Sequence, residues 1–131
     1  MLVKVLSVRQ PWVMLIILGY KDIENRTWES SYRGELYIHA SKKIQEVDWQ
    51  RIQTIMASEG TLQHFRNEPM NKTADSLGGI IGKVQMVDCV TESDSPWFEG
   101  KFGFVFENPE TVPFIPLRGQ QRIFNYELEE K

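Results

Sequence analysis

The sequence has little cysteine and little histidine: one cysteine, Cys89, and two histidines, His39 and His64, among 131 residues. One thiol cannot form an intramolecular disulfide, and one thiol with two imidazoles cannot build a cysteine-based zinc site. We therefore expect no metal and no other cofactor. The same cysteine usage is typical of an intracellular protein, so we expect a cytoplasmic location.

Long hydrophobic runs are also missing. The longest, from Trp12 to Leu18, has seven residues, whereas a membrane-spanning helix needs roughly 20. No small-residue cleavage site follows this run, which argues against a secretory signal. We expect no association with a membrane.

The common catalytic motifs are absent as well. The chain contains no G-x-x-x-x-G-K-[ST], no G-x-G-x-x-G, no G-x-S-x-G and no H-E-x-x-H. The sequence therefore gives no direct sign of a phosphate loop, a dinucleotide site, a nucleophile elbow or a zinc protease.

Charge is distributed unevenly along the chain, although the net charge is only −3. Residues 1 to 43 carry seven basic and four acidic side chains, whereas the remaining 88 residues carry eight basic and 14 acidic ones. A locally positive surface on an acidic protein can select a polyanion such as a nucleic acid. Scattered solubilising charge explains the same imbalance equally well.

The periodicity of apolar residues predicts an α+β fold of several short strands with two helices. No internal repeat and no linker interrupts the chain, so we expect one domain over residues 1 to 131. We expect strands over 22–28 and 35–40 that form a hairpin, and a surface loop over 59–77. The other expected strands are 3–8, 80–90, 102–106, 113–117 and 122–126, and the expected helices are 12–18 and 44–58.

The densest group of polar and aromatic residues runs from Gly19 to Trp28. If this segment is a strand, Glu24 and Arg26 project to the same side roughly 7 Å apart, near enough to form an ion pair. Such a pair can be purely structural, or it can belong to a binding site. Both readings stay open on the sequence alone.

At several separated places the chain resembles the ASCH domain family, within the PUA-like superfamily. The resemblance covers nearly the whole chain except residues 59 to 77. It rests on Leu6-Ser7-Val8-Arg9-Gln10-Pro11-Trp12, on Gly19-x-Lys21-x-x-Glu24-x-Arg26-x-Trp28, on Tyr32-Arg33-Gly34, on Ile38-His39-Ala40-Ser41, on Gly79 and Gly82 before Val87-Asp88-Cys89, on Phe104 to Pro109, and on Pro116-Leu117-Arg118-Gly119-Gln120.

The resemblance implies a small PUA-like β-barrel with helices packed on its outside and a cleft beside the first helix that binds nucleic acid. Within the family the cleft is lined by positions that correspond here to Gly19, Lys21, Glu24 and Arg26. A bacterial amidohydrolase branch deacylates N4-acetylcytidine. This chain is similar to that branch at Lys21. The proposed nucleophilic threonine of the branch, however, falls where this sequence has Glu24.

Two hypotheses follow for the function. In the first, the protein binds a nucleic acid or a nucleotide, RNA before DNA, through a basic cleft in which a tryptophan stacks on a base. The expected binding residues are Gly19, Lys21, Glu24, Arg26, Trp28, Arg33, His39, Ser41, Lys42 and Lys43, with Trp12 as a second stacking candidate.

The second hypothesis is a small hydrolase that acts on a modified nucleoside or nucleic acid. Glu24 would activate a water as the general base, and Lys21 would stabilise developing negative charge, without a metal. The sequence does not indicate the oligomeric state.

Overall fold

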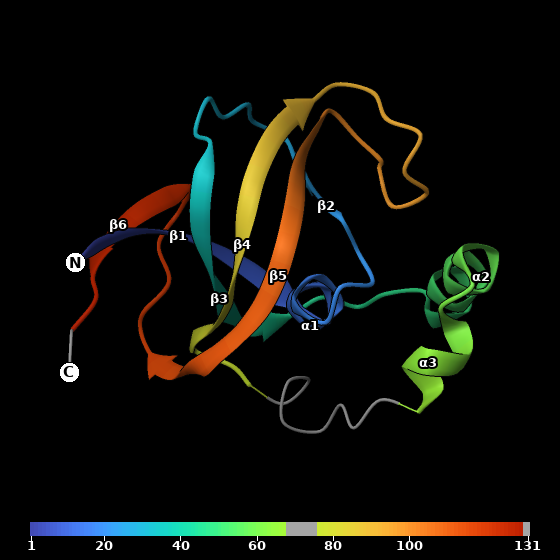
Figure 1. Ribbon diagram of the computed structural model, residues 1–131, viewed down its shortest axis with the longest axis horizontal. Coiled ribbons are helices and arrows are strands. Elements are labelled where there is room, and N and C mark those ends of the chain that lie inside the picture. Colours follow the sequence, from blue (N-terminus) through green and yellow to red (C-terminus); the bar gives the residue numbers. More distant parts are fainter. Residues whose placement is uncertain (68–75, 130–131) are drawn as a thin grey trace.

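The computed structural model describes residues 1–67 and 76–129. It is an α+β structure, as predicted, with six strands in one mixed sheet and three short helices (Figure 1). In chain order the elements are β1 (Leu2–Gln10), α1 (Trp12–Ile17), β2 (Ile23–Arg26), β3 (Gly34–Ile44), α2 (Trp49–Glu59), α3 (Leu62–Arg66), β4 (Gly79–Val90), β5 (Phe102–Pro116) and β6 (Ile123–Glu127).

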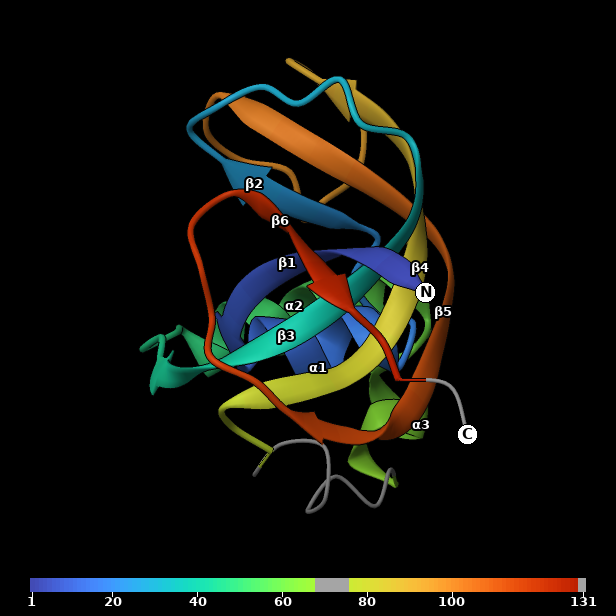
Figure 2. The same cartoon turned by 90° about the vertical axis from the view of Figure 1, so that its left-hand side faces the viewer.

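The strand order in the sheet is β2-β5-β4-β3-β1-β6. β1 runs parallel to β3, and the other neighbouring pairs are antiparallel. Figure 2 shows the sheet curling around α1. This arrangement is consistent with a PUA-like fold.

The expected closed barrel is wrong, because the sheet has two free edges, β2 and β6. Among the described residues no backbone ladder joins β2 to β1 or β6. β6 pairs with β1 only over Leu2 to Leu6, so the outer edge of β1 beyond Leu6 is left without a strand. A side chain spans the gap instead: Arg26 on β2 donates from Nη2 to the Ser7 carbonyl oxygen at 2.7 Å.

The expected hairpin of 22–28 with 35–40 is also wrong, since β2 pairs with β5 and β3 pairs with β1 and β4. Asn25 lies opposite Gly103 in the β2–β5 register. A Cβ at Gly103 would lie 2.5 Å from Ile23 Cδ1, so the missing side chain makes room for the Ile23 side chain. This complementarity joins segments about 80 residues apart, and local turn residues do not reveal it.

α1 occupies the middle of the molecule and is buried over Val13 to Ile17. One of its faces packs against β1, β3, β4 and β5 in the largest hydrophobic cluster, and the other packs against α2, α3 and Trp97. α1 therefore lies inside the molecule, as expected for a short helix that is apolar nearly all round. Residues 18 to 22 connect this buried helix directly to β2.

The second helix begins five residues later than expected, at Trp49 rather than Ile44. The Asp48 side chain accepts hydrogen bonds from the backbone N–H groups of Gln50 and Arg51, at 3.0 and 3.2 Å, and so caps the helix. Ile44 instead ends β3 and lies opposite Gln10 of β1. The cap places Arg51 in the first turn of α2.

Two further predictions need correction. Residues 62–66 of the expected surface loop 59–77 form α3, and residues 68–75 of that loop lie outside the described residues. The two expected strands 102–106 and 113–117 are parts of one continuous strand, β5, in which Asn108 has a φ of 53°.

Candidate functional site

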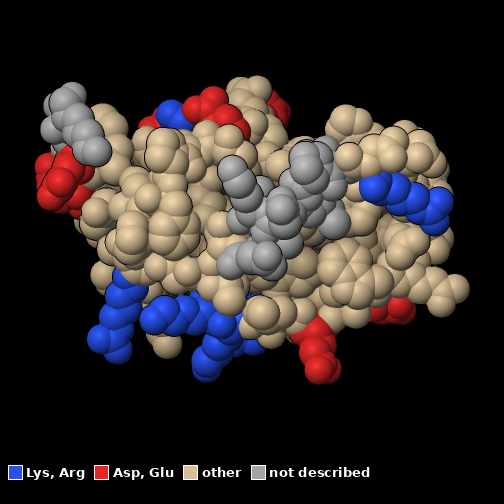
Figure 3. All heavy atoms as spheres, turned by 90° about the horizontal axis from the view of Figure 1, so that it is seen from below, with Lys and Arg blue, Asp and Glu red and all other residues tan. Residues whose placement is uncertain are grey.

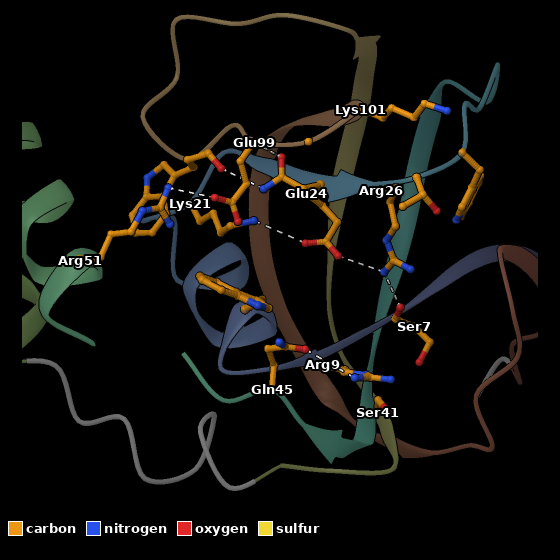
Figure 4. Close-up of a pocket in the computed structure, with 16 residues that line it drawn as sticks. Ser7, Arg9, Lys21, Glu24, Arg26, Ser41, Gln45, Arg51, Glu99 and Lys101 are labelled. Carbon is orange, nitrogen blue, oxygen red and sulfur yellow. Dashed lines mark hydrogen bonds and ion pairs between the residues drawn. The ribbon is translucent and has the colours of Figure 1, made fainter. Parts of the chain in front are cut away.

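A pocket of about 570 Å³ lies in the gap between β1 and β2 (Figure 4). Side chains from β1, α1, β2, the end of β3, the start of α2 and the loop before β5 line it. The pocket exists because the sheet curls without closing. The outer edges of β1 and β2 therefore face each other across a space that polar and aromatic side chains line.

The floor of this pocket is a chain of ion pairs through Glu24. Glu24 Oε1 lies 3.4 Å from Lys21 Nζ, and Glu24 Oε2 lies 3.0 Å from Arg26 Nη2. Lys21 is 4% exposed and Glu24 is 7% exposed. The predicted placement of Glu24 and Arg26 on one side of a strand is confirmed.

Lys21 is held from several directions. Its ammonium group donates to the Ile23 carbonyl oxygen and to Glu24, and it lies 5.0 Å from the centre of the Trp12 ring. Burial lowers the pKa of Lys21 below 10.5, and the opposing attraction of Glu24 raises it in part. Because a buried ammonium needs a counter-ion, removal of Glu24 would leave the Lys21 charge uncompensated in this part of the pocket.

This arrangement bears on the proposed general-base role of Glu24. A general base needs an oxygen directed at the water that it activates. In the structure each carboxylate oxygen of Glu24 faces a cation, Lys21 on one side and Arg26 on the other. The geometry is that of an ion-pair cluster that shapes a cation-rich cavity.

Three further cations surround the mouth of the pocket, and the sequence reasoning did not select them: Arg9, Arg51 and Lys101. Arg51 pairs with Glu99 at 3.3 Å, and Arg9 makes a long contact of 3.5 Å with the Gln45 amide oxygen. Within the described part of the chain Lys101 has no ion-pair partner. The pocket is therefore lined by five cations and two carboxylates.

Aromatic rings form part of the wall. Trp12 and Trp28 are partly exposed, and Trp97, which the sequence reasoning also missed, is buried. Trp28 packs edge-on against Phe104 with 5.0 Å between ring centres, and the Arg122 guanidinium lies 4.9 Å from its ring centre. The rings of Trp12 and Trp28 give the pocket flat apolar surfaces beside its charges, which is the combination that a nucleobase and its phosphate require.

A second hollow of about 970 Å³ adjoins the first, and Ser7 and Ser41 line both. His39, Lys42 and Lys43 from β3 line it on one side, and residues 116–121, which lead from β5 toward β6, line it on the other. We call the first cavity the Trp pocket and the second the Lys hollow. They are neighbouring parts of one surface.

Most of the predicted site residues are thus divided between the two cavities. Lys21, Glu24, Arg26, Trp28 and Ser41 line the Trp pocket, whereas His39, Lys42 and Lys43 line the Lys hollow together with Ser41.

Two predicted residues line neither cavity. Gly19 follows the C-cap residue of α1 and has a φ of 88°, and Arg33 lies 3.7 Å from Asp88 and donates to the carbonyl oxygens of Ser30 and Tyr32. Their roles in binding stay predictions.

His39 is buried between β1 and the segment that leads to β6. Its Nδ1 lies 2.9 Å from Ser7 Oγ, and its Nε2 lies 2.6 Å from the Leu117 carbonyl oxygen. A carbonyl only accepts, so Nε2 carries the proton and Nδ1 accepts from the Ser7 hydroxyl in the neutral ring. Burial lowers the pKa of His39 below 6.5, and the bond to Leu117 opposes this in part.

This geometry predicts that His39 makes the protein less stable in mild acid. Below pH 6.5 the unfolded state binds a proton that the folded state resists, so stability falls as the pH drops toward the lowered folded pKa. The slope is at most about 1.4 kcal/mol per pH unit for one proton. Urea unfolding at pH 7.5, 6.5 and 5.5 should show a steeper loss for the wild type than for His39→Gln. Parallel profiles would contradict the assignment.

Within residues 1–67 and 76–129 no group of three or more His, Cys, Asp or Glu side chains is placed to hold a metal ion. Among the same residues no helix is long and apolar enough to cross a membrane.

Comparisons with known proteins agree with the resemblance seen in the sequence. The family model of the ASCH domain matches residues 6–116. The chain is 31% identical over 134 residues to activating signal cointegrator 1 of Homo sapiens, and 28% identical over 129 residues to the protein of that name from Mus musculus. Each alignment covers 91% of this chain and 21% of the relative. The chain therefore spans about a fifth of the length of these curated relatives.

Proposed function

The chain belongs to the ASCH domain family, and we propose that it is a nucleic-acid-binding domain, formed by residues 1 to 131, that takes a nucleotide of RNA into the Trp pocket. The observation that carries this proposal is the composition of that pocket: five cations and exposed tryptophan surface around about 570 Å³. Cations attract the phosphate, and an aromatic face accepts any base.

The cations of the pocket differ in their availability. Lys21 and Arg26 are committed to Glu24, and Arg51 is paired with Glu99. Arg9 and Lys101 are exposed and carry no ion pair among the described residues. We therefore assign the phosphate contacts of the bound nucleotide to Arg9 and Lys101, and the shaping of the cavity to Lys21, Glu24 and Arg26.

The hydrolase alternative is not favoured. It needs Glu24 to activate water, and both oxygens of that carboxylate already face cations. The same contacts suit a binding site whose charge is held in place before the ligand arrives.

We expect the full chain to bind a short fluorescein-labelled RNA with an affinity that falls as salt rises. Each phosphate contact contributes about 0.7 to the slope of log K against log salt for a single strand, so the two contacts assigned to Arg9 and Lys101 give a slope of about −1.4, and each further contact along the strand adds about −0.7. Fluorescence anisotropy from 25 to 300 mM salt measures it. A polyglutamate peptide of equal charge is the control for charge alone, and we expect it to bind more weakly because it has no bases to stack.

The proposal fails if the protein shows no saturable binding to mixed-sequence RNA or DNA oligonucleotides at 25 mM salt. It fails equally if the polyglutamate peptide binds as tightly as the RNA.

A further inference from the structure

The Lys hollow differs from the Trp pocket in its chemistry. Lys42, Lys43 and Arg118 are exposed cations that line it, and Figure 3 shows Lys and Arg side chains gathered on the lower face of the molecule. None of the described residues that line the hollow is Asp or Glu, and none is Trp, Tyr or Phe. The hollow attracts anions, but it offers no aromatic face to a base.

The three cations of the hollow are available to a ligand. Across the described residues their side chains form no ion pair. Three of the five cations of the Trp pocket are different, because Lys21, Arg26 and Arg51 each have a carboxylate partner.

The floor of the hollow is closely packed. Ser7 and His39 are directly opposite each other in the parallel β1–β3 register, and the segment after β5 crosses them at Gly119. A Cβ on Gly119 would lie 2.8 Å from the His39 ring and 3.0 Å from Ser7 Oγ. Both ring nitrogens of His39 have partners. Since His39 and Ser7 are occupied in this way, the exposed Lys and Arg side chains are the groups left to bind a ligand.

The hollow and the pocket are adjacent, since Ser7 and Ser41 form part of the wall of each. Figure 4 shows Ser7, Arg9 and Ser41 together along the side of the Trp pocket where β1 and β3 run next to each other. A bound strand that leaves the pocket past these residues would next reach the Lys hollow. The surface therefore has one compartment with rings and cations, and a second, adjoining compartment with cations alone.

We propose that the Lys hollow binds the sugar-phosphate backbone that continues from the nucleotide in the Trp pocket, so that the ligand of this protein is a single-stranded polynucleotide rather than a free nucleotide. This inference rests on the proposed function of the pocket. Backbone contacts by Lys42, Lys43 and Arg118 add affinity without reading the base sequence. A free mononucleotide has no second phosphate to reach the hollow, and a strand does.

The test compares two probes on the full-length chain and on one triple variant, Lys42→Ala with Lys43→Ala and Arg118→Ala. The probes are uridine monophosphate and an eight-residue oligouridylate, with an eight-residue oligothymidylate as the DNA arm. All three positions are exposed, so the variant should keep its stability. A matched control removes the same charge outside both cavities: Lys4→Ala with Arg66→Ala and Lys83→Ala.

We expect the triple variant to bind either oligonucleotide at least about tenfold more weakly, with a salt slope smaller by about 2. Its affinity for uridine monophosphate should stay within about twofold of the wild type. The control variant should change the oligonucleotide affinity less than threefold.

The inference is overturned if the triple variant binds the oligonucleotides as the wild type does, or if it loses affinity for the mononucleotide to the same degree. It is also overturned if the control variant weakens binding equally, because the effect would then be one of net charge. If the wild type binds none of the probes, the proposed function of the pocket fails with it. If the wild type binds uridine monophosphate and the triple variant binds the oligonucleotides as the wild type does, the proposed role of the Lys hollow is refuted and the proposed function of the Trp pocket is not.

Discussion

Replacement of Glu24 by alanine should lower the free energy of unfolding by about 3 to 5 kcal/mol, the usual loss when one partner of a buried ion pair is removed. Glu24 is the carboxylate between Lys21 and Arg26, at 3.4 and 3.0 Å. Without it two cations face each other in a half-closed space, and Lys21 is 4% exposed. Arg26 is partly exposed, so solvent relieves some of the cost and places the effect toward the lower end of this range.

Urea unfolding followed by circular dichroism measures the change. Glu24→Gln keeps the size and one oxygen acceptor but loses the charge, so it should fall between the wild type and alanine. Glu29→Ala removes an exposed carboxylate from the segment that follows β2 and should change the free energy by less than about 0.5 kcal/mol. If Glu24→Ala costs no more than Glu29→Ala, the ion-pair cluster does not stabilise the pocket.

The sequence predicted best those features that depend on local periodicity. In the expected strand 35–40 the alternating residues Leu36, Ile38 and Ala40 all lie in the largest hydrophobic cluster, while Tyr37 lies in a different cluster. The same rule predicted that Glu24 and Arg26 share a side. A strand has a fixed period of two, so its faces follow directly from the sequence.

Pairing between distant segments could not be predicted in this way. The partner of β2 is β5, and the pairing depends on Gly103 leaving room for Ile23. The sheet also does not close into a barrel, because β2 and the part of β1 beyond Leu6 do not pair with each other. Arg26 donates to the Ser7 carbonyl oxygen across the gap between them. These are long-range properties of packing, and no local pattern encodes them.

The missed site residues have the same explanation. Arg51 is the third residue of α2, and its position depends on the Asp48 cap that delays the helix. Lys101 and Trp97 lie more than 70 residues from Glu24 in the chain. Arg9 could have been found, because it stands in the segment Leu6 to Trp12 that carries the family resemblance. Its exposure on β1 follows from alternation with the buried Val8 and Gln10.

The double variant Arg9→Ala with Lys101→Ala should bind uridine monophosphate about 100-fold more weakly than the wild type. Each side chain is assigned a charge-assisted contact with the phosphate, worth about 1.5 kcal/mol, and every 1.4 kcal/mol is tenfold in affinity. Both residues are exposed, and neither has an ion pair within residues 1–67 and 76–129. The free energy of unfolding should therefore change by less than about 1 kcal/mol for the pair.

Calorimetric titration of uridine monophosphate into the wild type, this double variant and a control, Lys4→Ala with Arg66→Ala, tests most directly whether the Trp pocket holds a nucleotide. We expect measurable binding to the wild type, an affinity within about twofold of it in the control, and a loss of about 100-fold in the double variant. Equal affinity in all three proteins, or an equal loss in the two variants, would contradict it.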